Sequence, residues 1–276
     1  MTWTELGCLG ILWLLPACGS DLDAGSDRHR GLLPVDERSP IVLVNDGWYD
    51  NWQAEYAATL ASNGRIQLAG IVVNASSGYP SVADNVRGFR ELVRAARDSG
   101  MRGVPDPIAS VAPVLVRPAD GSVESTVPNR SEGARFIVDA AKRLSTPVHP
   151  LVVATGGVLT DLADAYLLDN TLPKRVVVIA SLGSTTEAGA QLGPPNGEQD
   201  VWASWIVSSR FRYVQVNGFY DQLQEIPEAR VGELPQNAWG QWLNSKRPQI
   251  LDLIFACDQV SIMAAAFPAF ALDVQR

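Results

Sequence analysis

Short apolar runs that alternate with amphipathic segments limit the folds open to this chain. The runs are rich in valine, isoleucine and leucine, which is typical of strands buried on both faces. We expect strands near residues 41–45, 67–73, 112–116, 150–154, 174–180 and 212–216. We expect helices near residues 52–63, 81–98, 131–144, 159–168 and 200–208, with Ser131 beginning the third and a mainly helical segment after Tyr220. This alternation predicts an α/β fold with a mainly parallel central sheet and helices on both faces.

Oxygen-bearing side chains follow the first predicted strand directly. They are Asp46, Asp50 and Asn51. Open α/β sheets bind ligands beyond the carboxyl ends of their strands, and carboxylate and amide oxygens suit Ca²⁺. The sequence therefore predicts a cation site in this turn. The alternative reading of Asp46 is a turn residue that caps the following helix.

The amino terminus indicates export. Residues 1–17 contain an apolar run too short to span a bilayer but of the length found in a signal segment. Leu15-Pro16-Ala17-Cys18 resembles a bacterial lipobox, which makes Cys18 the predicted lipidated residue, residues 18–39 a flexible tether and residues 40–276 the folded domain. This predicts a bacterial cell-envelope lipoprotein that is periplasmic or surface-exposed. Because residues 1–5 contain no Lys or Arg, an uncleaved apolar anchor or a misplaced start codon stays open.

Composition excludes several classes of partner and site. The 276 residues are 46% hydrophobic and carry a formal net charge of -8, so a nucleic-acid partner is not expected. Only Cys257 remains if Cys8 leaves with the signal and Cys18 is acylated. An internal disulfide and a zinc site built from cysteine and histidine are therefore not expected.

The first loop also carries a family resemblance. Residues 44–51 resemble Asp-x-Asp-Pro-Gly-x-Asp-Asp, the opening motif of the inosine-uridine-preferring nucleoside hydrolases. Asp46 and Asp50 match its second and third aspartates, whereas Val44 and Asn51 replace the first and last. Other segments resemble the family in the same order along the chain, at residues 67–76, 150–163, 175–181, 200–207 and 257–258. Cys257 stands where many members carry a histidine.

The resemblance implies a Rossmann-like nucleoside hydrolase fold and a set of roles. It implies Ca²⁺ as cofactor, with Asp46, Asn51, the Thr160 carbonyl and Asp258 as its ligands. It implies Asp46 as general base, Asp50, Asn196 and Asp258 as ribose contacts, and Trp48 as a stacking residue for the base. Other readings stay open, because Asp258 could begin a helix and Trp48 could be a packing residue.

Three functions follow from these observations. The first is metal-assisted hydrolysis of N-glycosidic bonds in ribonucleosides or related glycosides. The second, favoured by Val44, Asn51 and Cys257, is an inactive lipoprotein of the same fold that binds a nucleoside or sugar. The third is an interaction or envelope-structural protein that binds no Ca²⁺. The expected partners are a small ribose-containing molecule and a membrane, and homo-oligomerisation stays open.

Overall fold

The computed structural model describes residues 35, 38–47, 53–181, 196–216 and 232–253, with side chains described as far as residue 245. The chain separates into two units, Met1–Leu32 and Leu33–Arg276, and every described residue belongs to the second. The predicted signal segment and Cys18 lie outside the described residues. Within the described part of the chain, no helix combines the length and apolar character needed to cross a bilayer.

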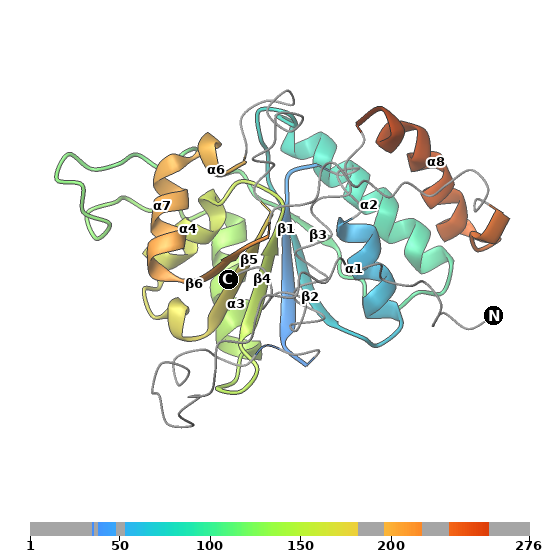
Figure 1. Ribbon diagram of the computed structural model, residues 1–276, viewed down its shortest axis with the longest axis horizontal. Coiled ribbons are helices and arrows are strands. Elements are labelled where there is room, and N and C mark those ends of the chain that lie inside the picture. Colours follow the sequence, from blue (N-terminus) through green and yellow to red (C-terminus); the bar gives the residue numbers. More distant parts are fainter. Residues whose placement is uncertain (1–34, 36–37, 48–52, 182–195, 217–231, 254–276) are drawn as a thin grey trace, which may run out of the picture. The chain divides into compact units, whose positions relative to one another are not determined.

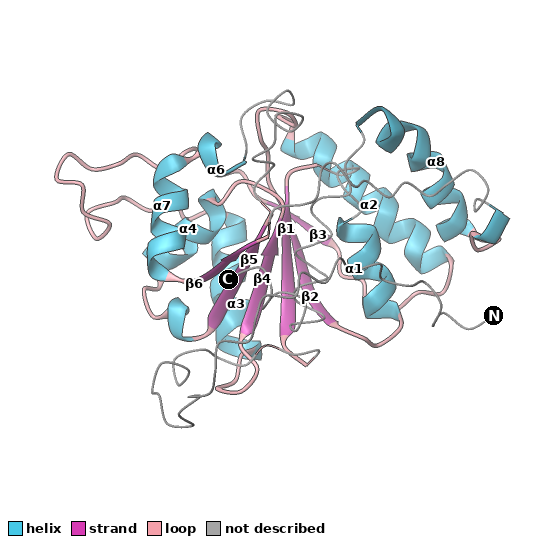
Figure 2. Cartoon of the chain, viewed as in Figure 1, coloured by secondary structure: helices cyan, strands magenta, loops and turns pink. Residues whose placement is uncertain are grey.

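The core of the fold is a six-stranded sheet in which all described pairs are parallel. Figures 1 and 2 show the strands fanning across the centre, with helices on either side. The strands are β1 (Pro40–Asn45), β2 (Gln67–Val73), β3 (Pro107–Ala109), β4 (Leu151–Thr155), β5 (Val176–Ala180) and β6 (Arg212–Gln215). Their order is β3-β2-β1-β4-β5-β6, so the strand order reverses between β1 and β4. Ligands of open α/β sheets bind at this switch point.

Helices cover both faces of the sheet (Figure 1). They are α1 (Gln53–Ser62), α2 (Val82–Asp98), α3 (Glu132–Leu144), α4 (Thr160–Leu168), η3 (Leu172–Lys174), α6 (Asn196–Gln199), α7 (Val201–Arg210) and α8 (Ala238–Leu253). Buried side chains of α1, α2 and α8 form one core layer, and those of α3, α4 and α7 form the other. The prediction of a parallel sheet with helices on both faces is confirmed.

The first strand shows why the sheet is buried on both faces. Ile41 and Leu43 belong to the layer under α1, α2 and α8, whereas Val42 and Val44 belong to the opposite layer. Successive side chains of a strand point to opposite faces, so an uninterrupted apolar run fills both layers. The run ends at Asn45, where polar residues begin at the carboxyl edge of the sheet.

The prediction of a strand at residues 112–116 is wrong. The third strand is β3, which begins at Pro107, five residues before the predicted start. It pairs with β2 in the register Ile71↔Pro107. Val114 and Val116 are instead 58% and 81% exposed, and the Leu115 N–H donates to Asp200 Oδ2 at 3.0 Å. Pro113 has no N–H to give to a ladder, and the valines of this segment meet no neighbouring strand among the described residues.

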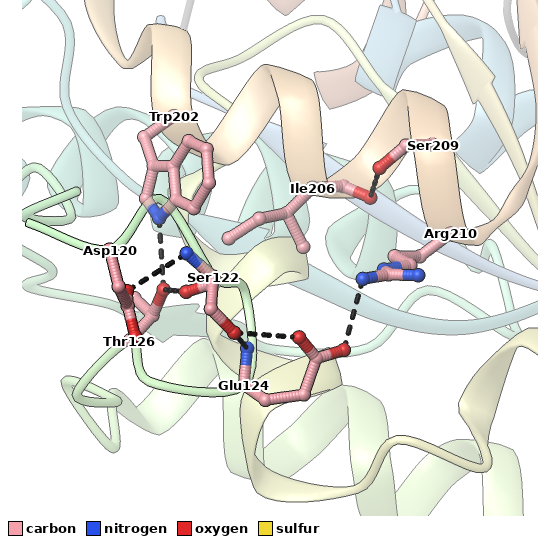
Figure 3. A network of polar contacts seen from close by, with 8 residues as sticks. All are labelled: Asp120, Ser122, Glu124, Thr126, Trp202, Ile206, Ser209 and Arg210. Carbon is pink, nitrogen blue, oxygen red and sulfur yellow. Dashed lines mark hydrogen bonds and ion pairs between the residues drawn. The ribbon is translucent and has the colours of Figure 1, made fainter. Parts of the chain in front are cut away.

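The long connection between β3 and α3, which contains residues 112–116, contacts α7 through side chains (Figure 3). Trp202 on α7 donates its indole N–H to Thr126 Oγ1 at 3.0 Å, and the Arg117 guanidinium lies 5.2 Å from the centre of the Trp202 ring. An exposed ion pair between Arg210 and Glu124 adds a third contact at 3.0 Å. These contacts hold the connection against α7, which comes much later in the chain.

Candidate functional site

Polar residues gather where β1, β2 and β4 end, at the switch point of the sheet. Asp46 follows β1, Asn74 follows β2, and Gly156 and Gly157 follow β4. Backbone bonds join these ends: the Asn74 N–H donates to the Asn45 carbonyl at 3.0 Å, and the Gly156 N–H donates to the Val44 carbonyl at 2.9 Å. The parallel ladders thus bring residues from three distant parts of the chain to one place.

Asp46 is a buried carboxyl group at this edge. Its side chain is 2% exposed, and its Oδ1 has no hydrogen-bond partner among the residues that the structure describes. Burial raises the pKa of Asp46 to about 6, against the opposing effect of a hydrogen bond from Ser76. The described contact between this turn and α1 is made by Asn45, whose amide donates to Gln53 Oε1 at 2.6 Å.

Asn74 lies beside Asp46 and is also buried, at 4% exposure. Its Nδ2 donates to the Val158 carbonyl at 3.0 Å and to Asp161 Oδ2 at 3.1 Å, while its Oδ1 has no partner within the described ranges. Gly157 faces both residues, since a Cβ there would lie 2.8 Å from Asn74 Oδ1 and 3.1 Å from the Asp46 nitrogen. A glycine is therefore needed at position 157 to keep this position clear.

Asp161 forms the polar layer behind Asn74. Its carboxylate is fully buried and accepts hydrogen bonds from Ser131 Oγ at 2.8 Å, from Ser110 Oγ and from Asn74. Burial raises the pKa of Asp161, and these three hydrogen bonds oppose that rise, whereas the neighbouring Asp164 adds to it. The group is thus a buried carboxyl held by neutral donors.

The structure places the predicted residues Thr160 and Asn196 at the same edge. Thr160 begins α4, and its hydroxyl donates to Asp200 Oδ2 at 2.7 Å. Asn196 begins α6; its Nδ2 donates to the Gly156 carbonyl and its Oδ1 accepts from Gln199 at 3.0 Å. Both residues therefore lie against the segment that follows β4.

Several of the predicted site residues lie outside the described residues. They are Trp48, Asp50, Asn51, Cys257 and Asp258. Of the predicted Ca²⁺ ligands, the structure describes only Asp46 and Thr160. Among the described residues, no three His, Cys, Asp or Glu side chains come together as a metal site would require.

The buried oxygens at the strand ends nevertheless fit a hard cation. Asp46 Oδ1 and Asn74 Oδ1 are acceptors that no described donor satisfies, and Ca²⁺ prefers carboxylate and carbonyl oxygens. Four carboxylates are at most 2% exposed nearby, on Asp46, Asp161, Asp164 and Asp200. None of the ion pairs described involves any of them. Asp161, Asp164 and Asp200 accept hydrogen bonds from neutral donors, so the unsatisfied Oδ1 of Asp46 is the carboxylate oxygen that favours a bound cation.

Sequence reasoning missed Asn74 and Asp161. Their importance depends on contacts between residues 87 positions apart, which no local pattern reveals. A weak signal existed for both, since Asn74 ends an apolar strand and Asp161 directly follows the predicted ligand Thr160. A polar residue just after a predicted strand in a parallel sheet is the feature to look for.

No family model matches this sequence, and no curated protein matches it. Solved structures do match in shape. An inosine-guanosine nucleoside hydrolase is 15% identical, with a TM-score of 0.62 over 83% of this chain and 79% of its own. A purine-preferring ribonucleoside hydrolase from Gardnerella vaginalis is 15% identical, with a TM-score of 0.59 over 84% and 81%.

A plant nucleoside hydrolase is 16% identical, with a TM-score of 0.55 over 84% of this chain and 80% of its own. At these identities the likeness concerns the backbone and not the side chains of the site. The strand order, the helices on both faces and these matches together show that the chain has the α/β fold of the nucleoside hydrolases.

Proposed function

We propose that this protein hydrolyses the N-glycosidic bond of ribonucleosides or related ribosides, with Ca²⁺ as its cofactor. The observation that carries the proposal is the buried Asp46 carboxyl with an unsatisfied oxygen, at the switch point of the sheet. The fold shared with nucleoside hydrolases supports this reaction class over other uses of such a site.

Asp46 is the proposed general base. Burial raises the pKa of Asp46 to about 6 in the metal-free protein, and a bound Ca²⁺ would lower it, which favours the ionised carboxylate that a base needs. In the proposed reaction a water oxygen attacks the anomeric carbon of the sugar, and the Asp46 carboxylate accepts the proton of that water. The C–N bond breaks, and its electron pair leaves with the nucleobase.

The residues that would hold Ca²⁺ are Asp46, Asn51, the Thr160 carbonyl and Asp258. When bound there, the ion would make a water more acidic and add to the binding of sugar hydroxyls. The unsatisfied oxygen of Asp46 supports its part in this set. The burial of Thr160 between the β4 loop and Asp200 gives its backbone a fixed place at the same edge.

Ribose recognition is proposed for Asp50, Asn196 and Asp258, with Trp48 stacking on the base. Asn196 has the best support, because its amide group is anchored to the Gly156 carbonyl beside β1. The donor that protonates the leaving base has no assignment: Cys257 replaces the histidine of many nucleoside hydrolases and is a weak acid-base group.

The test is a hydrolysis assay of purified protein with Ca²⁺ across purine and pyrimidine ribonucleosides. We expect turnover in the wild type and a loss of at least ~100-fold in kcat for Asp46→Ala, the scale of general-base catalysis. Asp106→Asn is the matched control, since this aspartate is exposed and pairs with Arg97 at 2.9 Å. Turnover by Asp46→Ala at the wild-type rate would remove Asp46 from the mechanism.

An inactive binding protein is the second candidate. Val44 is 2% exposed and packs in the layer of α3, α4 and α7, so it offers no ligand where the family motif has an aspartate. Thermal unfolding with and without Ca²⁺ and ribose separates the candidates, because a ligand that binds only the native state raises Tm. A shift without turnover supports the binding protein, and no shift supports a structural role.

We also propose that Cys18 carries a lipid that anchors the domain to a bacterial envelope membrane. The lipobox-like residues 15–18 and the short apolar run before them support this. In a bacterial host, the wild type should fractionate with membranes and take up a labelled fatty acid. Cys18→Ser should do neither, and equal labelling of both proteins would contradict the proposal.

A further inference from the structure

Asn74 has a fixed side-chain orientation that no role described so far explains. The two hydrogens of its amide nitrogen point to the Val158 carbonyl and to Asp161 Oδ2, at 3.0 and 3.1 Å. Turning the amide over would set its oxygen against a carbonyl and a carboxylate, which repel it. The Asn74 Oδ1 is therefore held on the opposite side of the amide group.

That oxygen and the Asp46 backbone both border Gly157. A Cβ at position 157 would lie 2.8 Å from Asn74 Oδ1 and 3.1 Å from the Asp46 backbone nitrogen. Asp46 Oδ1 and Asn74 Oδ1 are both buried acceptors that no described residue satisfies. An unsatisfied buried acceptor destabilises the folded protein, so a ligand that binds these oxygens is favoured at this edge of the sheet.

The charged residues around Asn74 Oδ1 indicate which kind of ligand would bind there. Asp161 sits behind Asn74 and draws its N–H toward a carboxylate, which increases the negative charge on Oδ1. Ser110 and Ser131 hold Asp161 in place through two hydroxyl donors. A neutral hydroxyl could satisfy one oxygen, but two acceptors backed by buried carboxylates favour a divalent cation.

We propose that Asn74 is a further ligand of the divalent cation at this site and that Asp161 is its positioning residue. This inference rests on the proposed function, which supplies the cation. It adds the side-chain oxygen of Asn74, directly after β2, to the proposed ligands Asp46, Asn51, Thr160 and Asp258. It also offers a compensation for the two aspartates that the opening motif lacks at Val44 and Asn51.

Direct binding of Ca²⁺ to the purified full chain tests the proposal. Calorimetric titration with Ca²⁺, and Tb³⁺ luminescence as a second probe, give Kd without any need for activity. We expect Asn74→Ala to raise Kd by at least ~10-fold, and Asp161→Asn to raise it by about 10-fold through loss of the orienting acceptor. Asn129→Ala is the matched control, because this half-buried asparagine lies in the connection between β3 and α3, where it donates to the Pro113 carbonyl.

Gly157→Ala is a second route should Asn74→Ala fail to fold. It removes no ligand but directs a methyl group against Asn74 Oδ1, so Kd should rise by at least ~10-fold while far-UV circular dichroism stays that of the wild type. A normal Kd in Asn74→Ala, or in Gly157→Ala where Asn74→Ala does not fold, overturns the proposal.

The proposal and the proposed function fail in different ways. If Asp46→Asn weakens Ca²⁺ binding and Asn74→Ala does not, Asn74 is no ligand but the site at Asp46 stands. If the wild type binds neither ion yet hydrolyses nucleosides without Ca²⁺, the ligand role of Asn74 is overturned and the enzyme remains. If the wild type neither binds an ion nor turns over substrate, both are overturned.

Discussion

Replacing Asp46 by asparagine should make the metal-free protein more stable while removing its activity. The wild-type carboxyl is 2% exposed and has an unsatisfied oxygen, so its ionised form is poorly solvated. Asparagine has nearly the same shape but no charge to bury. A functional residue that lowers stability is the expected trade-off at an active site.

The magnitude follows from the pKa of Asp46, which burial raises from 3.8 to about 6. This difference corresponds to about 3 kcal/mol of unfolding free energy, as an upper limit. The folded state binds the proton more tightly than the unfolded state, so this contribution to stability is fully present below pH 3.8. It is lost as the pH rises through about 6. Asp46→Asn should therefore match the wild type at pH 4 and exceed it by up to ~3 kcal/mol at pH 8.

The assay is urea unfolding in EDTA at several pH values, followed by far-UV circular dichroism. The quantity compared is the difference in unfolding free energy between wild type and variant at each pH. The pKa of Asp161 is also raised, and it makes the stability of both proteins depend on pH in the same way. Asp106→Asn is the control variant, because it makes the same change at an exposed aspartate. Added Ca²⁺ should stabilise the wild type more than Asp46→Asn. A stability difference that does not change between pH 4 and pH 8 would refute the reasoning.

Three further predictions concern packing and hydrogen bonds outside Asp46. Asp200→Ala removes the acceptor of the Thr160 hydroxyl and of two backbone N–H groups, and should lower the unfolding free energy by about 2–4 kcal/mol in urea. Trp202→Phe loses the hydrogen bond to Thr126 and weakens the contact with Arg117, which should cost about 1–2 kcal/mol by the same assay and leave Ca²⁺ affinity unchanged. Gly70→Ala would direct a methyl group to 2.3 Å from the Phe136 ring and should cost about 1–3 kcal/mol. A second change, Phe136→Leu, should restore part of that loss, and an additive double variant would contradict this explanation.

The fold was largely predictable because its signals are local. β1 and β5 are uninterrupted apolar runs, which is the pattern of strands buried on both faces. Ser131 does begin α3, accepting a hydrogen bond from the Ala134 N–H at 3.1 Å as a helix-capping residue does. The prediction of the third strand was wrong because its signal is not local. Val114 and Val116 are residue types that favour strands, but strand pairing depends on a neighbouring strand that the local sequence does not specify.

The candidate site was only partly predictable. The sequence points to Asp46 because it follows an apolar run and matches a motif, and to Asn196 through the same resemblance, and the roles of both stay predictions. Asn74 and Asp161 lie in segments of the chain that the sheet alone brings together, and their pairing appears only when β2 and β4 flank β1. The residues that would complete the ligand set, Asn51 and Asp258, lie outside the described residues and stay predictions.

The strand order has a consequence for engineering. The ends of β1 and β2 and the start of α4 bring Asp46, Asn74 and Asp161 together from three separate segments of the chain. The affinity of the proposed site for an ion should therefore be adjustable through β2 or α4 while Asp46, the proposed base, is kept.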